Sequence, residues 1–170
     1  MKRDIILIGM PGSGKTTVGK AVADMLKAEF CDTDSEVEKA ESRSPAHMIT
    51  ESGEAAFRKI EAKILKALLG HGRVTALGGG TVCTEEAVEY LKKSNSVIVY
   101  ISRPLDLILR TADFSNRPLT STADDLRRLY DERHGIYESL ADIVVLNNKS
   151  IREVAEKIVY EVNLYENNDN

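Results

Sequence analysis

The sequence predicts an α/β fold of three layers (αβα), in which a five-stranded parallel sheet lies between helices on both faces. Apolar runs of strand length alternate with segments of helical period along the chain, which is the pattern of βαβ units. No repeat, linker or low-complexity segment divides the 170 residues, and that length is sufficient for one core. We therefore expect a single domain that spans residues 1–170.

Five apolar runs are expected to form the strands of this sheet. In chain order they are "DIILIG" (4–9), "EFCDTD" (29–34), "RVTAL" (73–77), "SVIVYI" (96–101) and "DIVVLN" (142–147). Parallel strands are covered by helices on both faces, so near-continuous apolar runs of this kind are typical of them.

Helical segments fill the intervals between these runs. The first begins near Lys15, and its expected apolar face consists of Val18, Ala21, Val22, Met25 and Leu26. Residues 35–70 are helical with breaks near Pro45 and Gly53, and further helices are expected at 84–94, after Pro104, up to about 140 and after 150. Residues 112–122, "ADFSNRPLTST", are polar and carry no period, so they predict a loop.

Composition and charge exclude several classes of partner. A net charge of −4 gives no electrostatic reason to expect nucleic acid or an anionic membrane. No stretch approaches the ~20 apolar residues of a membrane span, so we expect a cytoplasmic protein. Cys31 and Cys83 are too few for a disulfide framework or a zinc site, and we expect both to be small buried hydrophobes. A monomer is expected, because no long exposed apolar helix face is evident.

The stretch "GMPGSGKTT" (9–17) directly follows the first apolar run. Gly9, Gly14, Lys15 and Thr16 match G-x-x-x-x-G-K-[ST], placed between a strand and a helix as a P-loop NTPase fold requires. In such a loop, glycines let backbone N–H groups point at phosphate oxygens, the lysine reaches the β- and γ-phosphates, and the hydroxyl ligates Mg²⁺. The alternative is a glycine-rich turn with a surface lysine. The expected ATP-binding residues here are Gly12, Ser13, Gly14, Lys15, Thr16 and Thr17.

Other motifs narrow the class of P-loop protein. "NNKS" (147–150) lacks the aspartate of a GTPase base-reading motif, and neither "VTAL" nor "VIVYI" ends in the aspartate that an ATPase or helicase would use. Asp32 and Asp34 instead follow the second strand, where they point to the same face if strand geometry persists. One carboxylate near Mg²⁺ and one near an acceptor hydroxyl suit phosphoryl transfer to an alcohol. The alternative is a solvated pair that caps the next helix.

At this point the chain closely resembles the shikimate kinases, small relatives of the nucleoside monophosphate kinases. The resemblance rests on "GMPGSGKTT", "DTD", "GEAAFRKIE", "LGGG", "RPL" and "DERHGIYESLAD", in the family's order and at nearly its spacing. It covers about residues 5–145 and implies transfer of the ATP γ-phosphoryl group to the 3-hydroxyl of shikimate, in the pathway to aromatic amino acids. Met48 and Ile49 stand where the family usually has an Ile-Phe type pair, and the loop between Arg117 and Arg133 is short.

The resemblance also implies roles for individual residues. Asp32 supports Mg²⁺ through water, and Asp34 binds the acceptor hydroxyls and acts as the base. Arg58 and Arg133 hold the substrate carboxylate, which suits the planar fork of a guanidinium group. Helices within about 34–61 bind the acceptor.

Two further arginines and a glycine run complete the implied site. Arg117 lies in a lid at about 112–122 and contributes to catalysis over the phosphates, and Arg110 lies against adenine. Residues Gly78, Gly79 and Gly80 let the backbone approach the substrate. From the residues alone, Arg58 and Arg133 could face water, Arg117 could contact nothing, and the glycines could form only a tight turn.

Two rival functions remain open at the level of sequence. A gluconate kinase or a nucleoside monophosphate kinase shares the P-loop and the length, but the combination of Asp34, Arg58, Arg133 and the glycine run argues against both. A nucleotide-binding module without catalysis would not need the carboxylate on the acceptor side.

Overall fold

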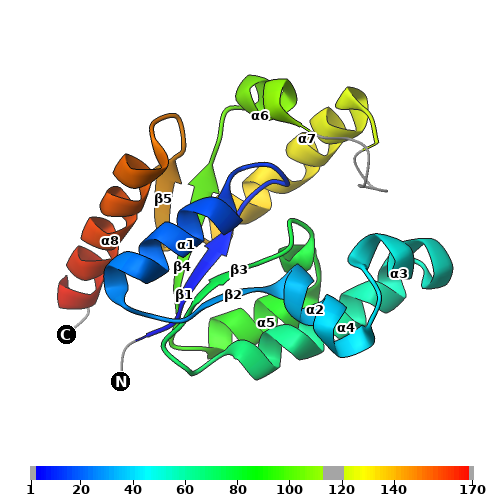
Figure 1. The fold of residues 1–170 in the computed structure, drawn as a ribbon, viewed down its shortest axis with the longest axis horizontal. Coiled ribbons are helices and arrows are strands. Elements are labelled where there is room, and N and C mark those ends of the chain that lie inside the picture. Colours follow the sequence, from blue (N-terminus) through cyan, green and yellow to red (C-terminus); the bar gives the residue numbers. More distant parts are fainter. Residues whose placement is uncertain (1–2, 113–120, 169–170) are drawn as a thin grey trace.

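The carboxyl ends of five parallel strands meet at one edge of the sheet. The computed structural model describes residues 3–112 and 121–168, and its strands lie in the order β2-β3-β1-β4-β5 (Figure 1). Their bounds are β1 (Ile5–Ile8), β2 (Phe30–Asp32), β3 (Val74–Ala76), β4 (Val97–Ser102) and β5 (Ile143–Leu146). Every neighbouring pair is parallel, so the loops that follow the strands gather at the same edge. The predicted strand set is confirmed.

Helices follow the strands as the sequence predicts. Their bounds are α1 (Lys15–Leu26), α2 (Thr33–Glu41), α3 (Pro45–Ser52), α4 (Glu54–Leu68), α5 (Glu85–Lys93), α6 (Leu105–Thr111), α7 (Ala123–Leu140) and α8 (Ile151–Asn168), with a 3₁₀ turn η1 (Thr81–Cys83). The break near Pro45 is a helix start, where the Ser44 side chain accepts a hydrogen bond from the His47 backbone N–H. Gly53 separates α3 from α4 at a φ of 82°.

The expectation that Asp34 extends from a strand is wrong. β2 ends at Asp32, and α2 begins at Thr33. The cause is local, because Asp32 Oδ1 accepts a hydrogen bond from the Asp34 backbone N–H at 3.1 Å and thereby caps the helix. Asp34 therefore projects from the first turn of α2 rather than from the face of a strand.

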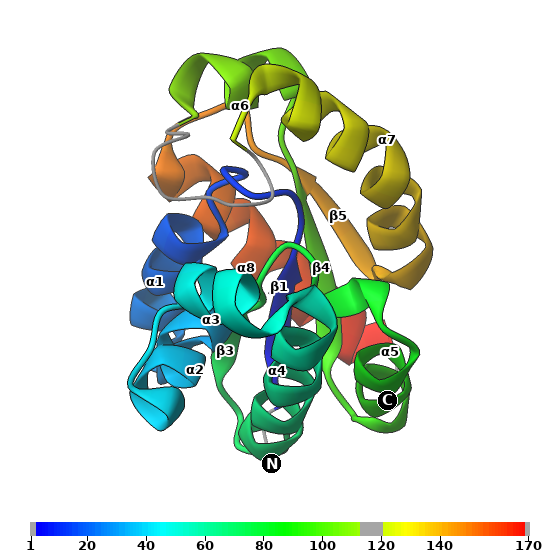
Figure 2. The ribbon, with the colours of Figure 1, turned by 90° about the vertical axis from the view of Figure 1, so that its right-hand side faces the viewer.

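Helices cover the sheet on both faces, as predicted. α1 and α8 pack on one face, where side chains such as Val22 and Ile158 meet Leu7 and Val99 of the sheet. α4, α5 and α7 pack on the other face against Ile6 (Figure 2). A smaller cluster of Val37, Met48 and Phe57 joins α2, α3 and α4 beside this second layer. Within the described residues, no helix combines the length and the apolarity that a bilayer-spanning segment needs.

The buried face of α1 is rotated from its predicted position. Met25 is 41% exposed, whereas Ala23 is buried. The reason is the close approach of the helix to the sheet at Gly19, where a Cβ would lie 2.6 Å from Phe30 Cε2. This contact centres the buried face on Gly19 and turns Met25 toward solvent.

The two cysteines differ in exposure. Cys31 is buried in β2, as expected. Cys83 is exposed at the end of η1, so the expectation of burial is wrong there. The cause is the turn, which directs Thr81 and Val82 inward and leaves the third residue outside the core.

Candidate active site

The phosphate loop (residues 9–16) joins β1 to α1 at the carboxyl edge of the sheet. Gly12 and Gly14 have φ values of 78° and 92°, which residues with a Cβ rarely adopt. Lys15 is 8% exposed, and its Nζ donates hydrogen bonds to the carbonyl oxygens of Gly9 and Met10, both at 2.8 Å. The loop therefore closes around the ammonium group of its own lysine, beside the positive end of α1.

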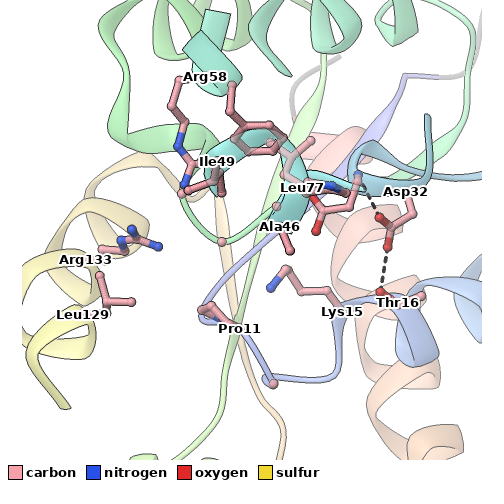
Figure 3. A pocket seen from close by; sticks show the side chains of 17 residues that line it. Pro11, Lys15, Thr16, Asp32, Ala46, Ile49, Arg58, Leu77, Leu129 and Arg133 are labelled. Carbon is pink, nitrogen blue, oxygen red and sulfur yellow. Dashed lines mark hydrogen bonds between the residues drawn. The ribbon is translucent and has the colours of Figure 1, made fainter. Parts of the chain in front are cut away.

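A pair of oxygen-bearing side chains lies next to this loop. Thr16 Oγ1 donates a hydrogen bond to Asp32 Oδ2 at 2.7 Å (Figure 3). Mg²⁺ that accompanies a nucleotide typically takes one or two protein oxygens, with phosphates and water completing its ligands. The hydroxyl and the carboxylate fit that requirement. Among the described residues there is no cluster of three or more His, Cys, Asp or Glu side chains suited to a metal ion.

A cavity of about 260 Å³ opens between the phosphate loop, the α2–α4 region, residues 78–80 and α7. It brings together most of the site residues that the sequence predicts, namely Gly12, Lys15, Thr16, Asp32, Asp34, Arg58, Gly78, Gly79, Gly80 and Arg133. Apolar side chains of Ile49, Phe57, Leu77 and Leu129 complete its wall. Arg58 and Arg133 approach from the side of the cavity opposite Thr16 and Asp32 (Figure 3).

Asp34 is a carboxylate of this cavity whose pKa is raised. Burial raises its pKa to about 6, and the nearby charges of Glu61 and Asp32 act in the same direction. Lys15 and Arg58 oppose this shift. A carboxylate with such a pKa is ionised at neutral pH and is a stronger base than an ordinary aspartate.

Arg58 is held in place by two carboxylates of its own helix. Its Nη1 lies 2.6 Å from Glu61 Oε2, and its Nη2 lies 3.0 Å from Glu54 Oε1. Burial lowers its pKa, but the Glu61 and Glu54 carboxylates together outweigh burial, and the pKa is raised overall. The side chain is only 11% exposed, so Arg58 does not simply face water.

Arg133 comes from α7 on the far side of the cavity. It is 7% exposed, although it lies in a highly charged stretch of sequence. One helical turn later, the Tyr137 hydroxyl donates a hydrogen bond to the Gly79 carbonyl oxygen at 2.5 Å. Burial raises the pKa of Tyr137 well above its usual range, which keeps its hydroxyl a donor. Tyr137 therefore ties α7 to the glycine run.

The glycine run is constrained by the side chains around it. A Cβ at Gly80 would overlap the Arg58 guanidinium group, and a Cβ at Gly79 would lie 2.7 Å from Pro11 Cδ. At Gly78 a Cβ would overlap Glu61. Gly78 and Gly80 thus leave room for the side-chain ends of Glu61 and Arg58, and Gly79 leaves room for Pro11.

Several predicted residues lie outside this cavity. Ser13, Gly14 and Thr17 do not line it, although Ser13 is fully buried within the phosphate loop. The Arg110 side chain is 75% exposed and lies 3.9 Å from Asp106 on α6. Arg117 lies outside the described residues, as does most of the proposed lid at 112–122.

Sequence reasoning missed Glu61, the buried partner of Arg58. Glu61 is 1% exposed and also accepts a hydrogen bond from Thr81 Oγ1 at 2.5 Å. A signal was present, because an Arg and a Glu three residues apart on a helix face each other. Thr33 was also missed, and its Oγ1 accepts a hydrogen bond from the Gly78 backbone N–H at 2.8 Å.

Comparison with known proteins gives a consistent result. A model of the shikimate kinase family matches residues 11–163. A shikimate kinase of Clostridium beijerinckii is 35% identical over 160 residues, which are 93% of this chain and 94% of the relative. A solved structure of shikimate kinase from Acinetobacter baumannii in complex with shikimate has a TM-score of 0.88 at 31% identity and covers 95% of this chain and 93% of that one. The shikimate kinase of Aquifex aeolicus has a TM-score of 0.82 at 36% identity, with 94% and 96% covered.

Proposed function

The chain belongs to the shikimate kinase family, and from that premise we propose how its own residues perform the reaction. It is an ATP-dependent kinase that transfers the γ-phosphoryl group of ATP to the 3-hydroxyl of shikimate, with shikimate 3-phosphate and ADP as products. The observation that carries the residue roles is the cavity of about 260 Å³, which is lined by the phosphate loop, by Asp34 with its raised pKa, and by Arg58 and Arg133.

On the nucleotide side, we assign phosphate binding to the backbone of residues 12–17 and to Lys15. Lys15 Nζ already lies inside the loop, where two carbonyl oxygens hold it. Its charge offsets the negative charge that spreads over the transferring oxygens. Thr16 and Asp32 would hold Mg²⁺, which when bound offsets part of the charge of the triphosphate.

On the acceptor side, Arg58 and Arg133 bind the shikimate carboxylate. Two planar guanidinium groups select an anionic acceptor and reject neutral sugars, because each can take a carboxylate with two parallel hydrogen bonds. The Glu54 and Glu61 carboxylates orient Arg58 before the substrate arrives. This reduces the ordering that binding would otherwise require.

Asp34 acts as the general base. It lies within the same cavity, and its pKa of about 6 leaves it ionised but basic at neutral pH. It accepts the proton of the acceptor hydroxyl as the oxygen attacks the γ-phosphorus in line with the departing ADP oxygen. The catalytic assignment consists of Lys15, Asp34 and Arg117, and the role of Arg117 in a lid at 112–122 rests on the resemblance alone.

The remaining features of the proposal concern the whole protein. We propose that the chain forms one kinase domain, acts as a monomer in the cytoplasm and binds neither nucleic acid nor membranes. Size-exclusion chromatography with light scattering tests the oligomeric state, and a dimer at micromolar concentration would contradict the monomer.

The decisive assay is ADP release with a panel of acceptors. We expect ADP with shikimate and none with gluconate or AMP, and a large loss with shikimate in the Arg58→Ala variant. Activity on gluconate or AMP without activity on shikimate would refute the proposed acceptor. Equal activity of parent and variant would refute the carboxylate role of Arg58.

A further inference from the structure

Asn147 connects the end of β5 to the phosphate loop. It is 7% exposed, and its Nδ2 donates a hydrogen bond to the Ser13 carbonyl oxygen at 2.7 Å. Its own backbone N–H donates to the Ser102 carbonyl oxygen at 2.7 Å, so the residue is fixed at the end of β4 as well. The amide is therefore a fixed donor to one peptide of the loop. This hydrogen bond joins two residues that are 134 positions apart in the sequence.

The loop leaves room for this amide at Gly14. A Cβ on Gly14 would lie 2.6 Å from Asn147 Nδ2, closer than any real side chain could remain. Gly14 also has a φ of 92° and is the residue that precedes α1. The amide of Asn147 thus lies directly against the peptide that joins Ser13 to Gly14.

The orientation of that peptide decides where one phosphate-binding donor points. In a planar trans peptide, the carbonyl oxygen and the following N–H project to opposite sides. A hydrogen bond that holds the Ser13 carbonyl toward Asn147 therefore directs the Gly14 N–H away from β5. A peptide next to glycine reverses easily, because glycine occupies positive and negative φ almost equally. A reversed peptide would present a carbonyl oxygen to the phosphates in place of a donor.

We propose that Asn147 is a positioning residue for ATP, which acts by holding the Ser13–Gly14 peptide in the orientation that presents the Gly14 N–H to the triphosphate. The proposal rests on the proposed function, since it deepens the account of the same nucleotide site. An aspartate could not replace Asn147, because a carboxylate would face the Ser13 carbonyl oxygen and add negative charge near the phosphates.

The experiment compares Asn147→Ala and the isosteric Asn147→Asp with the parent. Asn148→Ala is the matched control, because Asn148 is the same residue type at the next position and is exposed. We expect Asn147→Ala to raise KM for ATP about tenfold, because the substitution removes one buried hydrogen bond to a loop carbonyl. Asn147→Asp should raise it further, whereas KM for shikimate stays at the parent value in both variants. The control should match the parent in every constant.

A purely structural role gives a different pattern. It would lower the melting temperature while leaving KM for ATP unchanged, or would raise both KM values together, and either result overturns the proposal. If Asn147→Ala does not fold, the isosteric variant decides, and if neither folds, Asn147 is a folding determinant and the proposal fails. Calorimetric Kd values for ATP test Asn147 independently of turnover, so a parent without shikimate-dependent ADP release would refute the proposed function and leave this test intact.

Discussion

The two sides of the cavity are built in different ways. Most of the nucleotide side comes from one contiguous stretch, residues 9–17, which uses mainly backbone groups between β1 and α1. The acceptor side is assembled from α2, α4, α7 and the glycine run, and it uses charged side chains that ion pairs and close packing hold in place. Binding on the nucleotide side depends on the direction in which backbone N–H groups point. Binding on the acceptor side depends on charged side chains in a partly buried environment.

This difference determines how each side responds to substitution. On the nucleotide side a single exposed side chain contributes little, because many donors share the phosphates. On the acceptor side each buried charged group has few substitutes, and removing it leaves its partners unpaired. Substitutions on the acceptor side should therefore have the larger effects, with Asp34 first because we assign it to the chemical step.

The largest effect is expected for Asp34→Asn. Loss of the general base should lower kcat by about 10²–10⁴-fold. The fold should not suffer, because the pKa of Asp34 rises from 3.8 to about 6 on folding, so its contribution to stability declines as pH rises through about 6. At pH 8 the ionised carboxylate costs the folded state free energy that the neutral amide does not.

Steady-state kinetics and thermal melting at pH 8 check this prediction together. The melting temperature of Asp34→Asn should equal or exceed that of the parent. The control is Asp24→Asn, which changes an exposed aspartate of α1. A variant that keeps its kcat, or that loses activity only because it melts earlier, would contradict the assignment.

An intermediate effect is expected for Arg133→Lys. The substitution keeps the positive charge but removes the planar fork that binds a carboxylate with two hydrogen bonds. We expect KM for shikimate to rise about 10–100-fold, because that range corresponds to the loss of one charge-assisted hydrogen bond. KM for ATP should not change. Arg128→Lys on the same helix is the control, since the Arg128 side chain is 66% exposed. Equal KM values for shikimate in the two variants would show that the shikimate carboxylate does not bind Arg133.

The smallest effect is expected for Arg110→Ala, on the nucleotide side. The Arg110 side chain is 75% exposed and is only loosely paired with Asp106 at 3.9 Å. A guanidinium group stacked on an exposed ring system contributes about 0.5–1 kcal/mol, so KM for ATP should rise about 2–5-fold. Arg127→Ala, an exposed arginine of α7, provides the reference value. A change in KM for shikimate would contradict the expected difference between the two sides. So would a rise in KM for ATP as large as the rise in KM for shikimate in Arg133→Lys.

The sequence was most informative where one stretch determines one structure. The phosphate loop and the alternation of strands and helices follow from local patterns, and the predicted strands, layers and start of α1 agree with the structure. The exposed Met25 was not predictable, because the rotation of α1 depends on how closely Gly19 approaches Phe30 from another segment. The helical placement of Asp34 was within reach, because an aspartate two residues earlier is a frequent helix cap.

The acceptor side was harder to predict from residues alone. Arg133 lies in a charged run that ordinarily faces water, and its burial depends on the contact of α7 with the glycine run through Tyr137. Its predicted role came from the family resemblance. Asn147 was missed because its partner, the Ser13 carbonyl oxygen, belongs to a segment that it meets only in the folded chain. The pairing of Glu61 with Arg58 was within reach, because both lie on α4, but its contact with Thr81 depends on the packing of another segment.

The central claim is that Asp34 is the base at the meeting point of the two sides, and the pH dependence of kcat/KM for shikimate tests it most directly. Protonation of Asp34 should produce an acid limb near pH 6, below which kcat/KM falls about tenfold per pH unit. Because the Glu61 charge raises the pKa of Asp34, Glu61→Gln should move this limb to lower pH. A profile that stays flat from pH 7 to pH 5, or a limb that moves upward in Glu61→Gln, would contradict the account.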